Sequence, residues 1–476
     1  MNVLPDEVLL EIFELQTNSW WYELYGPKAA IEKWQSLVHV CRRWRNIVFR
    51  SPRRLELRLL CTPGTPARDT LDVWPALPLV VDCIMPFTSG TDNIIAALGQ
   101  SNRVSYICLS ALTDWQLEEV LAVMQVPFPE LRDLLLGSNS EAPPAIPDSF
   151  LDGSAPRLKS FRLDGIQYPG LPNLLLSGTH LVELCLLNIP HSGSFSFVPM
   201  VDLFSGLFSL EILRLQFLSP QSRHDWESRN LPPPKRSILP ALKVFRFKGV
   251  TEYLEALVIF IDTPRLDEMD ITFFNQIDFD CPRLAQFIHR TPLLRALDEA
   301  IVQFHDSTAR IRLRSLKSDY STVDDLRIDI SCREPDWQLS SIEQVCNSSL
   351  HPNSPVEDLY IEHQYSKLVW KDDAIENTLW LQLLLPFTAV KNFYLSKEFA
   401  PGIAAALQEL VEGRITEVLP SLQNIFVEAL EALGPFQENI GQFAAARQLS
   451  NHPIAVFDWE KEEEEEEEED YDVESM

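Results

Sequence analysis

The sequence lacks the short motifs that most often mark an enzyme. It contains no G-x-x-x-x-G-K-[ST], no G-x-G-x-x-G and no G-x-S-x-G. Only 16 of its 476 residues are glycine, which leaves few loops that could cradle a phosphate group. The nine histidines are scattered and none has the H-E-x-x-H spacing of a zinc hydrolase. We therefore expect a protein that is not an enzyme and needs no metal ion or other cofactor.

Closely spaced cysteines and long apolar runs are also missing. The eight cysteines form no C-x-x-C pair, which argues against a zinc ribbon or a disulfide framework. The apolar stretch 379–390 is interrupted by Gln382 and Pro386, and no stretch approaches the twenty residues that span a bilayer. The N-terminus shows no basic region followed by an apolar run, the pattern of a secretory signal. We expect a reduced, intracellular protein of the cytoplasm or nucleus that contacts no membrane.

The charge balance is strongly negative. The formal net charge is −29, which repels the phosphate backbone of nucleic acids, so we expect no nucleic-acid partner. Hydrophobic residues make up 46% of the chain and charged residues 23%, as in an ordinary globular protein. The length suits two domains or one large repeat domain.

The first fifty residues predict two amphipathic helices. Pro5 suits a first helical turn, and Asp6 and Glu7 place negative charge at the positive end of the helix dipole. Apolar residues then recur at helical spacing, at Val8, Leu9, Ile12 and Phe13. A second helix is expected over about 29–49, with its apolar face formed by Trp34, Leu37, Val38, Cys41, Trp44 and Val48. Two such helices cannot bury all of this surface on each other, which favours a partner.

The order of these residues resembles an F-box, the helical hook that binds the Skp adaptor of a cullin ubiquitin ligase. Leu4-Pro5-Asp6-Glu7-Val8-Leu9 is followed by Val40-Cys41-Arg42-Arg43-Trp44 and then by Ser51-Pro52. About a dozen more residues than usual separate the two parts, so the prediction is an F-box over 3–52 with an inserted loop at about 16–30. The alternative is an ordinary helical pair packed on the main domain. The residues that match the family's adaptor-binding motif are Leu4, Pro5, Val8, Leu9, Ile12, Phe13, Val40, Cys41 and Trp44.

The body of the chain carries an irregular repeat of the form apolar-x-x-apolar-x-apolar. The first and last clear copies are Val104/Ile107/Leu109 and Leu422/Ile425/Val427, and successive copies begin 23 to 34 residues apart. This period is typical of leucine-rich repeats, in which each unit gives a short strand and a returning helix or loop. We therefore predict an α/β fold: an irregular leucine-rich-repeat solenoid, or horseshoe, over 53–457. The alternative is a solenoid of helical repeats, which short apolar strands bounded by proline and glycine disfavour.

In such a solenoid, the residues between the buried apolar ones line the concave face of the sheet. Clustered arginines there suit recognition of carboxylate or phosphate, and tyrosine offers rigid area with a polar tip. The hypothesis is a binding site for an acidic or phosphorylated target; the alternative is ordinary solvated strand positions. The candidate residues are Arg162, Arg214, Arg246, Lys248, Tyr360 and Tyr394.

The C-terminus is a run of acidic residues. Residues 458–476 contain 13 acidic residues and one lysine, and like charges at this density predict a disordered, solvated tail. The tail either keeps the protein soluble, binds a basic protein, or competes for the basic residues of the concave face. Just before it, 435–449 predicts a closing helix and 454–457 a last strand.

An F-box followed by repeats resembles the F-box proteins with a repeat-type target-binding domain. The residue pattern around 40–55 is similar to that of the expanded F-box families of mushroom-forming fungi. The resemblance implies a substrate-recognition subunit of a Skp–cullin–F-box ubiquitin ligase. Its F-box would bind the Skp adaptor, and through it a cullin, and its repeats would bind a target protein for ubiquitination. The alternatives are a leucine-rich-repeat scaffold outside any ligase and an acidic chaperone that binds basic proteins through its tail.

Overall fold

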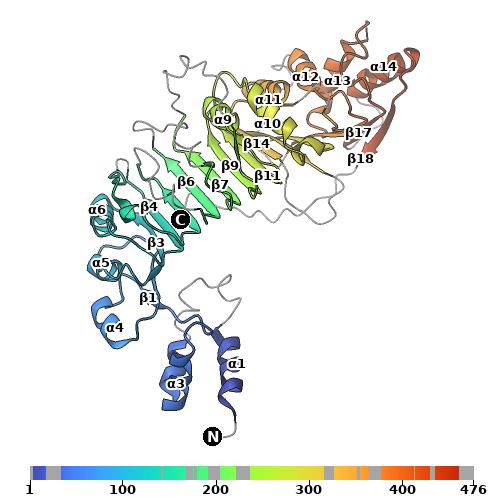
Figure 1. Ribbon diagram of the computed structural model, residues 1–476. Coiled ribbons are helices and arrows are strands. Elements are labelled where there is room, and N and C mark those ends of the chain that lie inside the picture. Colours follow the sequence, from blue (N-terminus) through green and yellow to red (C-terminus); the bar gives the residue numbers. More distant parts are fainter. Residues whose placement is uncertain are drawn as a thin grey trace. The chain divides into compact units, whose positions relative to one another are not determined.

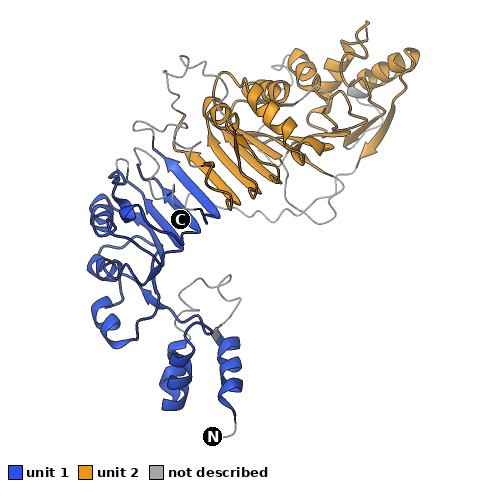
Figure 2. Cartoon of the chain, viewed as in Figure 1, with its two compact units in different colours: residues 1–196, 472–476 blue, residues 197–471 orange. Residues whose placement is uncertain are grey.

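The structure, a computed structural model, describes most of the chain and divides it into two compact units. Unit 1 comprises residues 1–196 and 472–476, and unit 2 comprises residues 197–471 (Figure 2). The described residues are 4–17, 34–140, 143–167, 175, 179–190, 204–220, 236–315, 326–350, 354–363, 377–411, 413–428 and 435–459. Most of the predicted loop at 16–30 and the tail from 460 onward lie outside these ranges.

Unit 1 begins with a helical hook made of α1 (Asp6–Thr17), a helical stretch at 34–40 and α3 (Arg42–Arg50). The prediction of one continuous second helix over 29–49 is wrong. Cys41 interrupts it with extended backbone angles, φ −158° and ψ 167°, and its Sγ accepts a hydrogen bond from the backbone N–H of Trp44. Cys41 therefore acts as the N-cap of α3, where a new helix begins.

The rest of unit 1 is a parallel sheet with helices along one side (Figure 1). Its six strands follow one another in chain order, so each new strand adds to the edge left by the previous one. The strands are β1 (Leu59–Cys61), β2 (Leu79–Cys83), β3 (Val104–Leu112), β4 (Asp133–Ser138), β5 (Ser160–Asp164) and β6 (Glu183–Ile189). The helices are α4 (Ala67–Val73), α5 (Thr91–Leu98) and α6 (Asp114–Val123), with a short 3-10 turn, η1 (Phe150–Gly153).

Unit 2 continues the same plan with longer helices. Its strands are β7 (Ile212–Phe217), β9 (Val244–Gly249), β11 (Glu268–Phe273), β12 (Glu299–Phe304), β13 (Thr308–Arg314), β14 (Leu326–Ser331), β15 (Asp358–His363), β16 (Asn392–Leu395), β17 (Asn424–Glu428) and β18 (Ala455–Trp459). Two short strands, β8 (Ser237–Ile238) and β10 (Ile261–Asp262), pair separately. The helices are α9 (Thr251–Val258), α10 (Pro282–Arg290), α11 (Pro335–Ser349), α12 (Asn377–Leu384), α13 (Ala400–Gln408) and α14 (Pro435–Leu449), with the 3-10 turn η3 (Leu294–Ala296). Successive helices pack against one another, α9 on α10 and so on to α14.

The predicted apolar triplets form the core. Every described triplet residue is buried, from Val104 to Val427. Equivalent positions also lie side by side: Leu134 pairs in register with Phe161, and Phe161 with Leu184. A single unit cannot bury its apolar face, but stacked units form one continuous core. The leucine-rich-repeat-like character predicted from the triplets is confirmed by this register and burial.

The series of parallel strands is interrupted between β11 and β15. The strand order there is β11-β14-β13-β12-β15, and β13 runs antiparallel to both of its neighbours. A short turn at Asp306 and Ser307 returns the chain from β12 to β13, so the two strands form a hairpin. The triplets of β12 and β14 are therefore separated by an extra strand that carries no triplet of its own.

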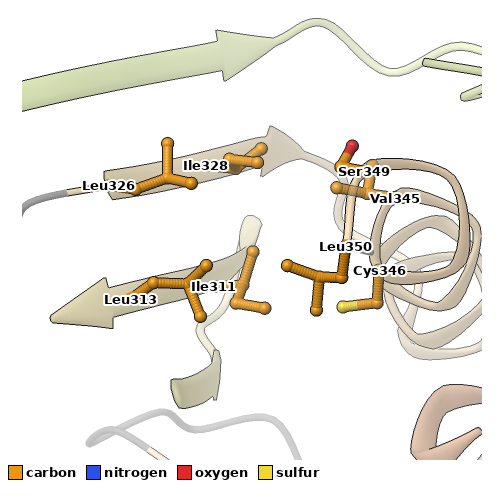
Figure 3. Close-up of a pocket in the computed structure, with 8 residues that line it drawn as sticks. All are labelled: Ile311, Leu313, Leu326, Ile328, Val345, Cys346, Ser349 and Leu350. Carbon is orange, nitrogen blue, oxygen red and sulfur yellow. The ribbon is translucent and has the colours of Figure 1, made fainter. Parts of the chain in front are cut away.

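A small cavity lies behind β13 and β14, where α11 covers the sheet (Figure 3). Its volume is about 10 Å³, which barely admits one water molecule. Seven of the side chains that surround it are apolar or sulfur-bearing and one is Ser349; the others are Ile311, Leu313, Leu326, Ile328, Val345, Cys346 and Leu350. Burial raises the pKa of the Cys346 thiol, so this cysteine stays protonated. The cavity is a packing gap in the core and not a ligand site.

The C-terminal end of unit 2 agrees with the sequence in its helix and differs in its last strand. The predicted closing helix is α14 (Pro435–Leu449). The predicted last strand is β18 (Ala455–Trp459), but it includes Asp458 and Trp459, so the prediction that the disordered tail begins at 458 is wrong for these two residues. Both residues pair with β17, since Glu428 lies opposite Trp459 in parallel register.

Candidate functional site

The first candidate surface is an apolar stripe on α1 and its approach. Leu4, Val8, Ile12 and Leu15 follow one another at three- or four-residue spacing, so they share one helix face. All four are exposed, Val8 at 37% and Ile12 at 42% of its area. Val40, at the end of the next helical stretch, is 58% exposed. An exposed apolar stripe on a short helix is typical of a surface that a partner protein covers.

The other predicted adaptor-binding residues divide between surface and interior. Pro5 and Cys41 are exposed, and Trp44 is half-buried. Leu9 and Phe13 are buried on an adjacent face of α1, and the ring of Phe13 lies 4.8 Å from that of Trp44. Leu9, Phe13 and Trp44 therefore hold the hook together, while the exposed residues are free to contact a partner.

Two ion pairs fix the hook's geometry. The guanidinium of Arg43 on α3 donates to the Asp6 carboxylate at 2.6 Å and to the backbone carbonyl of Leu4 at 2.6 Å. Arg54 donates to the carboxylate of Glu14 at 2.8 Å. Exposed pairs such as these add little stability, but they orient α1 relative to α3. The apolar stripe is thereby presented in a defined direction.

Aromatic packing joins the hook to the first repeat of unit 1. The indole N–H of Trp34 donates to the carbonyl of Arg58 at 2.9 Å, just before β1. The rings of Trp34 and Phe49 both pack edge-on against Trp74, at 5.2 and 6.3 Å between centroids. Trp74 follows α4, so the hook shares a small core with the repeats.

The second candidate surface is the sheet face opposite the helices. In unit 1 this face contains Arg162, which donates to Glu183 at 2.7 Å on the next strand. Glu183 also accepts from the hydroxyl of Ser160 at 2.9 Å. Burial alone would raise the pKa of Glu183, but Arg162 outweighs burial and lowers it. Arg162 is therefore part of an ion pair within the sheet.

In unit 2 the predicted face residues fall on one row across the strands. Arg214 of β7 pairs in register with Arg246 of β9, and Tyr360 of β15 with Tyr394 of β16. Lys248 lies two residues beyond Arg246 on the same face. Between the two groups, the same row continues through Asp270, Arg327, Arg312 and Ile301. The sequence-predicted residues of unit 2 thus belong to one continuous surface.

Carboxylates on the same face pair with several of these arginines. Arg246 donates to Glu268 at 2.7 Å, and Asp329 accepts from Arg310 at 2.6 Å and from Arg327 at 2.7 Å. Arg314 pairs with the fully buried Glu299. Burial would raise the pKa of Asp329, but Arg310 and Arg327 lower it overall, so this carboxylate stays charged. The expected patch of free cations is therefore a network of alternating charges in which basic groups predominate.

Asp270 belongs to this network, but one of its carboxylate oxygens has no hydrogen-bond partner among the described residues. That oxygen, Oδ1, is buried. Burial raises its pKa above the ordinary value, and the nearby Arg327 and Arg246 only partly oppose that rise. The charged form of Asp270 is therefore less stable in the folded chain than in the unfolded chain.

Asp270→Asn is expected to raise stability at pH 7. Because the folded pKa is raised, the folded chain binds a proton that the unfolded chain lacks in the pH range just above 3.8, and stability falls as pH rises through that range. Asparagine removes this loss. Urea unfolding should give a higher midpoint for the variant at pH 7 and equal midpoints well below pH 3.8, where Asp270 is neutral in both the folded and the unfolded chain. A lower midpoint at pH 7 would show that Arg246 and Arg327 need the charge.

An aromatic ladder forms the other half of the face. The rings of Tyr360 and Tyr394 stack at 4.1 Å and 6°, and those of Tyr394 and Phe426 at 4.5 Å and 8°. Phe457 extends the stack from β18 at 5.2 Å. Trp459 meets the rings of Tyr360 and Tyr394 edge-on. Burial is the main cause that raises the pKa of Tyr360 and Tyr394, so both hydroxyls stay neutral.

Sequence reasoning missed several residues of this surface. Arg310, Arg312 and Arg314 lie on β13, and the strict alternation Thr-Ala-Arg-Ile-Arg-Leu-Arg over 308–314 is a strand signal that could have located them. Phe426 lies between the last two apolar residues of the triplet Leu422/Ile425/Val427. Tyr394 has the same position in its own triplet, so Phe426 could have been found by that equivalence. Phe457 and Trp459 follow the last triplet, and nothing in the repeat pattern points to them.

Comparison with known proteins gives little further information. No protein-family model matches the chain. No curated protein matches it either. Among solved structures, the leucine-rich repeat-containing protein LegL7 from Legionella pneumophila is similar, with 12% identity over 82% of this chain and 98% of that chain and a TM-score of 0.22. A TM-score this low says nothing about function, so the repeat character rests on the strand register and the buried triplets.

Two kinds of site are not found in the described ranges. No helix there has the length and apolar character needed to cross a membrane. Within those ranges, no three His, Cys, Asp or Glu side chains come together in a way that could hold a metal ion. The two candidate surfaces of the described residues are the apolar stripe of the hook and the sheet face of unit 2.

Proposed function

We propose that this chain is the substrate-recognition subunit of a Skp–cullin–F-box ubiquitin ligase. The observation that carries the proposal is the exposed stripe Leu4, Val8, Ile12 and Leu15, on a hook whose residues follow the F-box order. The stripe would bind the Skp adaptor, and through it a cullin. The interior residues Leu9, Phe13 and Trp44 would keep the hook in shape.

The repeats would bind the target protein. The sheet face of unit 2 combines basic groups with a ladder of aromatic side chains, and both kinds of residue are enriched where proteins bind each other. The chain would do no chemistry itself. It would raise the local concentration of the target near the ubiquitin-loaded enzyme, as any tether does.

The proposal is tested by titrating a purified Skp adaptor into the full chain and measuring binding by calorimetry. We expect a one-to-one complex with a Kd of about 1 μM or tighter, because burial of four large apolar side chains contributes roughly 1.5–3 kcal/mol each before the costs of association. Absence of binding at 100 μM adaptor would refute the F-box assignment. A leucine-rich-repeat scaffold or an acidic chaperone of basic proteins would then be the better description.

A further inference from the structure

The sheet face of unit 2 has two chemically different halves. From β7 to β12, basic side chains outnumber acidic ones: the face carries Arg214, Arg246, Lys248, Arg310, Arg312, Arg314 and Arg327 against Glu268, Asp270, Glu299 and Asp329. From β15 to β18, the same face carries the aromatic ladder, and its charged residues are the acidic Asp358, Glu362 and Glu428. A ligand that is acidic throughout would meet like charges over the second half. The face therefore favours a ligand whose two ends differ in chemistry.

The basic half is open at Arg214. This arginine pairs with no carboxylate among the described residues, and its Nε is buried without a hydrogen-bond partner. Its neighbour in register, Arg246, uses Nε and Nη2 on a single oxygen of Glu268. Lys248 lies 5.9 Å from the centre of the Phe274 ring and forms no ion pair within the described ranges. A carboxylate placed here would complete open hydrogen bonds and reduce the repulsion between two adjacent guanidinium groups.

The arginines nearer to the ladder already have carboxylate partners. Arg310 and Arg327 share the carboxylate of Asp329. Arg314 pairs with the fully buried Glu299. The acidic end of a ligand is therefore expected over β7 and β9, and not over β13 and β14.

The aromatic half offers an apolar strip at the other end of the face. Tyr360, Tyr394 and Phe426 are half-buried and stack ring on ring, and Phe457 keeps 44% of its area exposed. The ring of Trp459 lies edge-on beside those of Tyr360 and Tyr394, at 5.9 and 5.4 Å between centroids. Rigid aromatic side chains give a large contact area at a small cost in conformational entropy. An aliphatic or aromatic side chain of a ligand would pack on this strip.

The strand order sets the distance between the two ends. From β7 the order runs through β9, β11, β14, β13 and β12 to β15. At about 4.8 Å between strands, these six steps cover roughly 29 Å. An extended chain covers this distance in about nine residues, at roughly 3.3 Å each.

We propose that an extended segment of the target protein crosses this face, with acidic residues on Arg214, Arg246 and Lys248 and an apolar residue on the aromatic ladder. The acidic and apolar residues of the segment lie at least about nine positions apart. This inference rests on the proposed function, because it names the chemistry of the target that the repeats select. Its test uses peptides alone, so it does not depend on the adaptor.

The test measures the binding of fluorescent peptides to the full chain by anisotropy. Each peptide has three glutamates at one end and a leucine and a phenylalanine at the other, joined by glycine and serine. Both chain directions are made, and the tighter one is compared at two spacings. With about twelve joining residues the ends reach roughly 43 Å, and with about three they reach roughly 13 Å. We expect the longer peptide to bind at least about ten-fold more tightly, because only it can engage both ends. Equal affinity of the two, or no binding of the longer one at about 1 mM, would overturn the proposal.

A pair of variants locates the acidic end. Arg214→Gln with Lys248→Gln should weaken binding of the longer peptide at least about five-fold. Arg265→Gln with Arg295→Gln removes the same charge from exposed positions of unit 2 outside the face and should leave binding unchanged. A peptide with glutamine in place of its glutamates should bind the natural chain and both variants equally. Equal weakening of the acidic peptide by both pairs would mean that only net charge matters, which would also overturn the proposal.

A second pair locates the apolar end. Trp459→Gln should weaken binding of the longer peptide at least about three-fold. Trp337→Gln is the control, because Trp337 lies on α11, away from the face, and is 53% exposed. Unchanged binding by Trp459→Gln, or equal loss in both variants, would contradict the assignment of the ladder to the apolar end. Adaptor binding is measured on the same proteins. An adaptor complex without peptide binding would overturn this inference alone, and peptide binding without an adaptor complex would overturn the F-box assignment alone.

Discussion

Val8→Asp combined with Ile12→Asp is expected to weaken binding of the Skp adaptor at least a hundred-fold. Each side chain contributes roughly 1.5–3 kcal/mol when a partner buries it, and an aspartate in its place brings an unpaired charge to the interface. Loss of about 2.7 kcal/mol already lowers affinity a hundred-fold. Calorimetric titration of the adaptor into the natural and variant chains measures the change directly.

The fold should survive these two substitutions. Val8 and Ile12 are both exposed, whereas Phe13, which holds α1 to Trp44, is buried on a different face of the helix. Leu9 is a poor choice for this experiment because it is buried, and aspartate there would disrupt the hook whether or not the hook binds an adaptor. Circular dichroism and the urea midpoint should therefore match those of the natural chain.

The matched control makes the same two changes at exposed apolar positions elsewhere. Val126→Asp and Ile277→Asp replace residues that are 45% and 90% exposed and lie outside the hook. We expect this pair to bind the adaptor as the natural chain does. Full adaptor affinity in the hook variant would show that the stripe is not the contact. Equal loss in both variants would point to a general effect of added negative charge.

The repeat core could be predicted because its signal is local. Three apolar residues within six positions define a strand and the turn before it, and each repeat supplies them without reference to the others. Leu210, Leu213 and Leu215 are fully buried for this reason, as are Leu181, Leu184 and Leu186. Burial of these residues follows from their pattern, whatever the order of the strands.

Strand order could not be predicted in the same way. The triplets of β12 and β14 look like consecutive repeats, but β13 lies between them because a hairpin turn at Asp306 and Ser307 reverses the chain. Whether an alternating segment enters the main sheet or a separate loop depends on which strand edge is open when it folds. That is a tertiary property, and the sequence of 308–314 alone does not contain it.

The candidate site was predicted in its positions but not in its electrostatics. Arg246 and Arg310 find their carboxylates on neighbouring strands, 22 and 19 residues away in sequence. These pairs form only once the strand register is known, so a list of outward-facing arginines overstates the free positive charge. The hook shows the same limit, since the capping role of Cys41 depends on its backbone angles.

Arg447→Met is expected to destabilise the C-terminal end of unit 2 by about 3–5 kcal/mol, because four backbone carbonyls lose the guanidinium that donates hydrogen bonds to them. Arg447, on α14, is fully buried. Its guanidinium donates to the carbonyls of Ile415, Leu419, Pro420 and Leu422, at 3.1 to 3.4 Å. Burial lowers the pKa of Arg447, and among the described residues no carboxylate pairs with it, so the four carbonyls stabilise its charge.

Hydrogen exchange is the suitable measurement because repeat proteins can unfold from one end. A loss of about 3 kcal/mol should speed exchange of the α14 and β17 amides more than a hundred-fold and leave those of β7 and β9 unchanged. Arg414→Met is the control, because Arg414 is an exposed member of a surface ion pair with Glu417 near the same loop. It should have no measurable effect. Unchanged exchange in Arg447→Met would contradict this prediction. It would mean that methionine packing and water replace the four hydrogen bonds, so that the buried guanidinium adds no net stability.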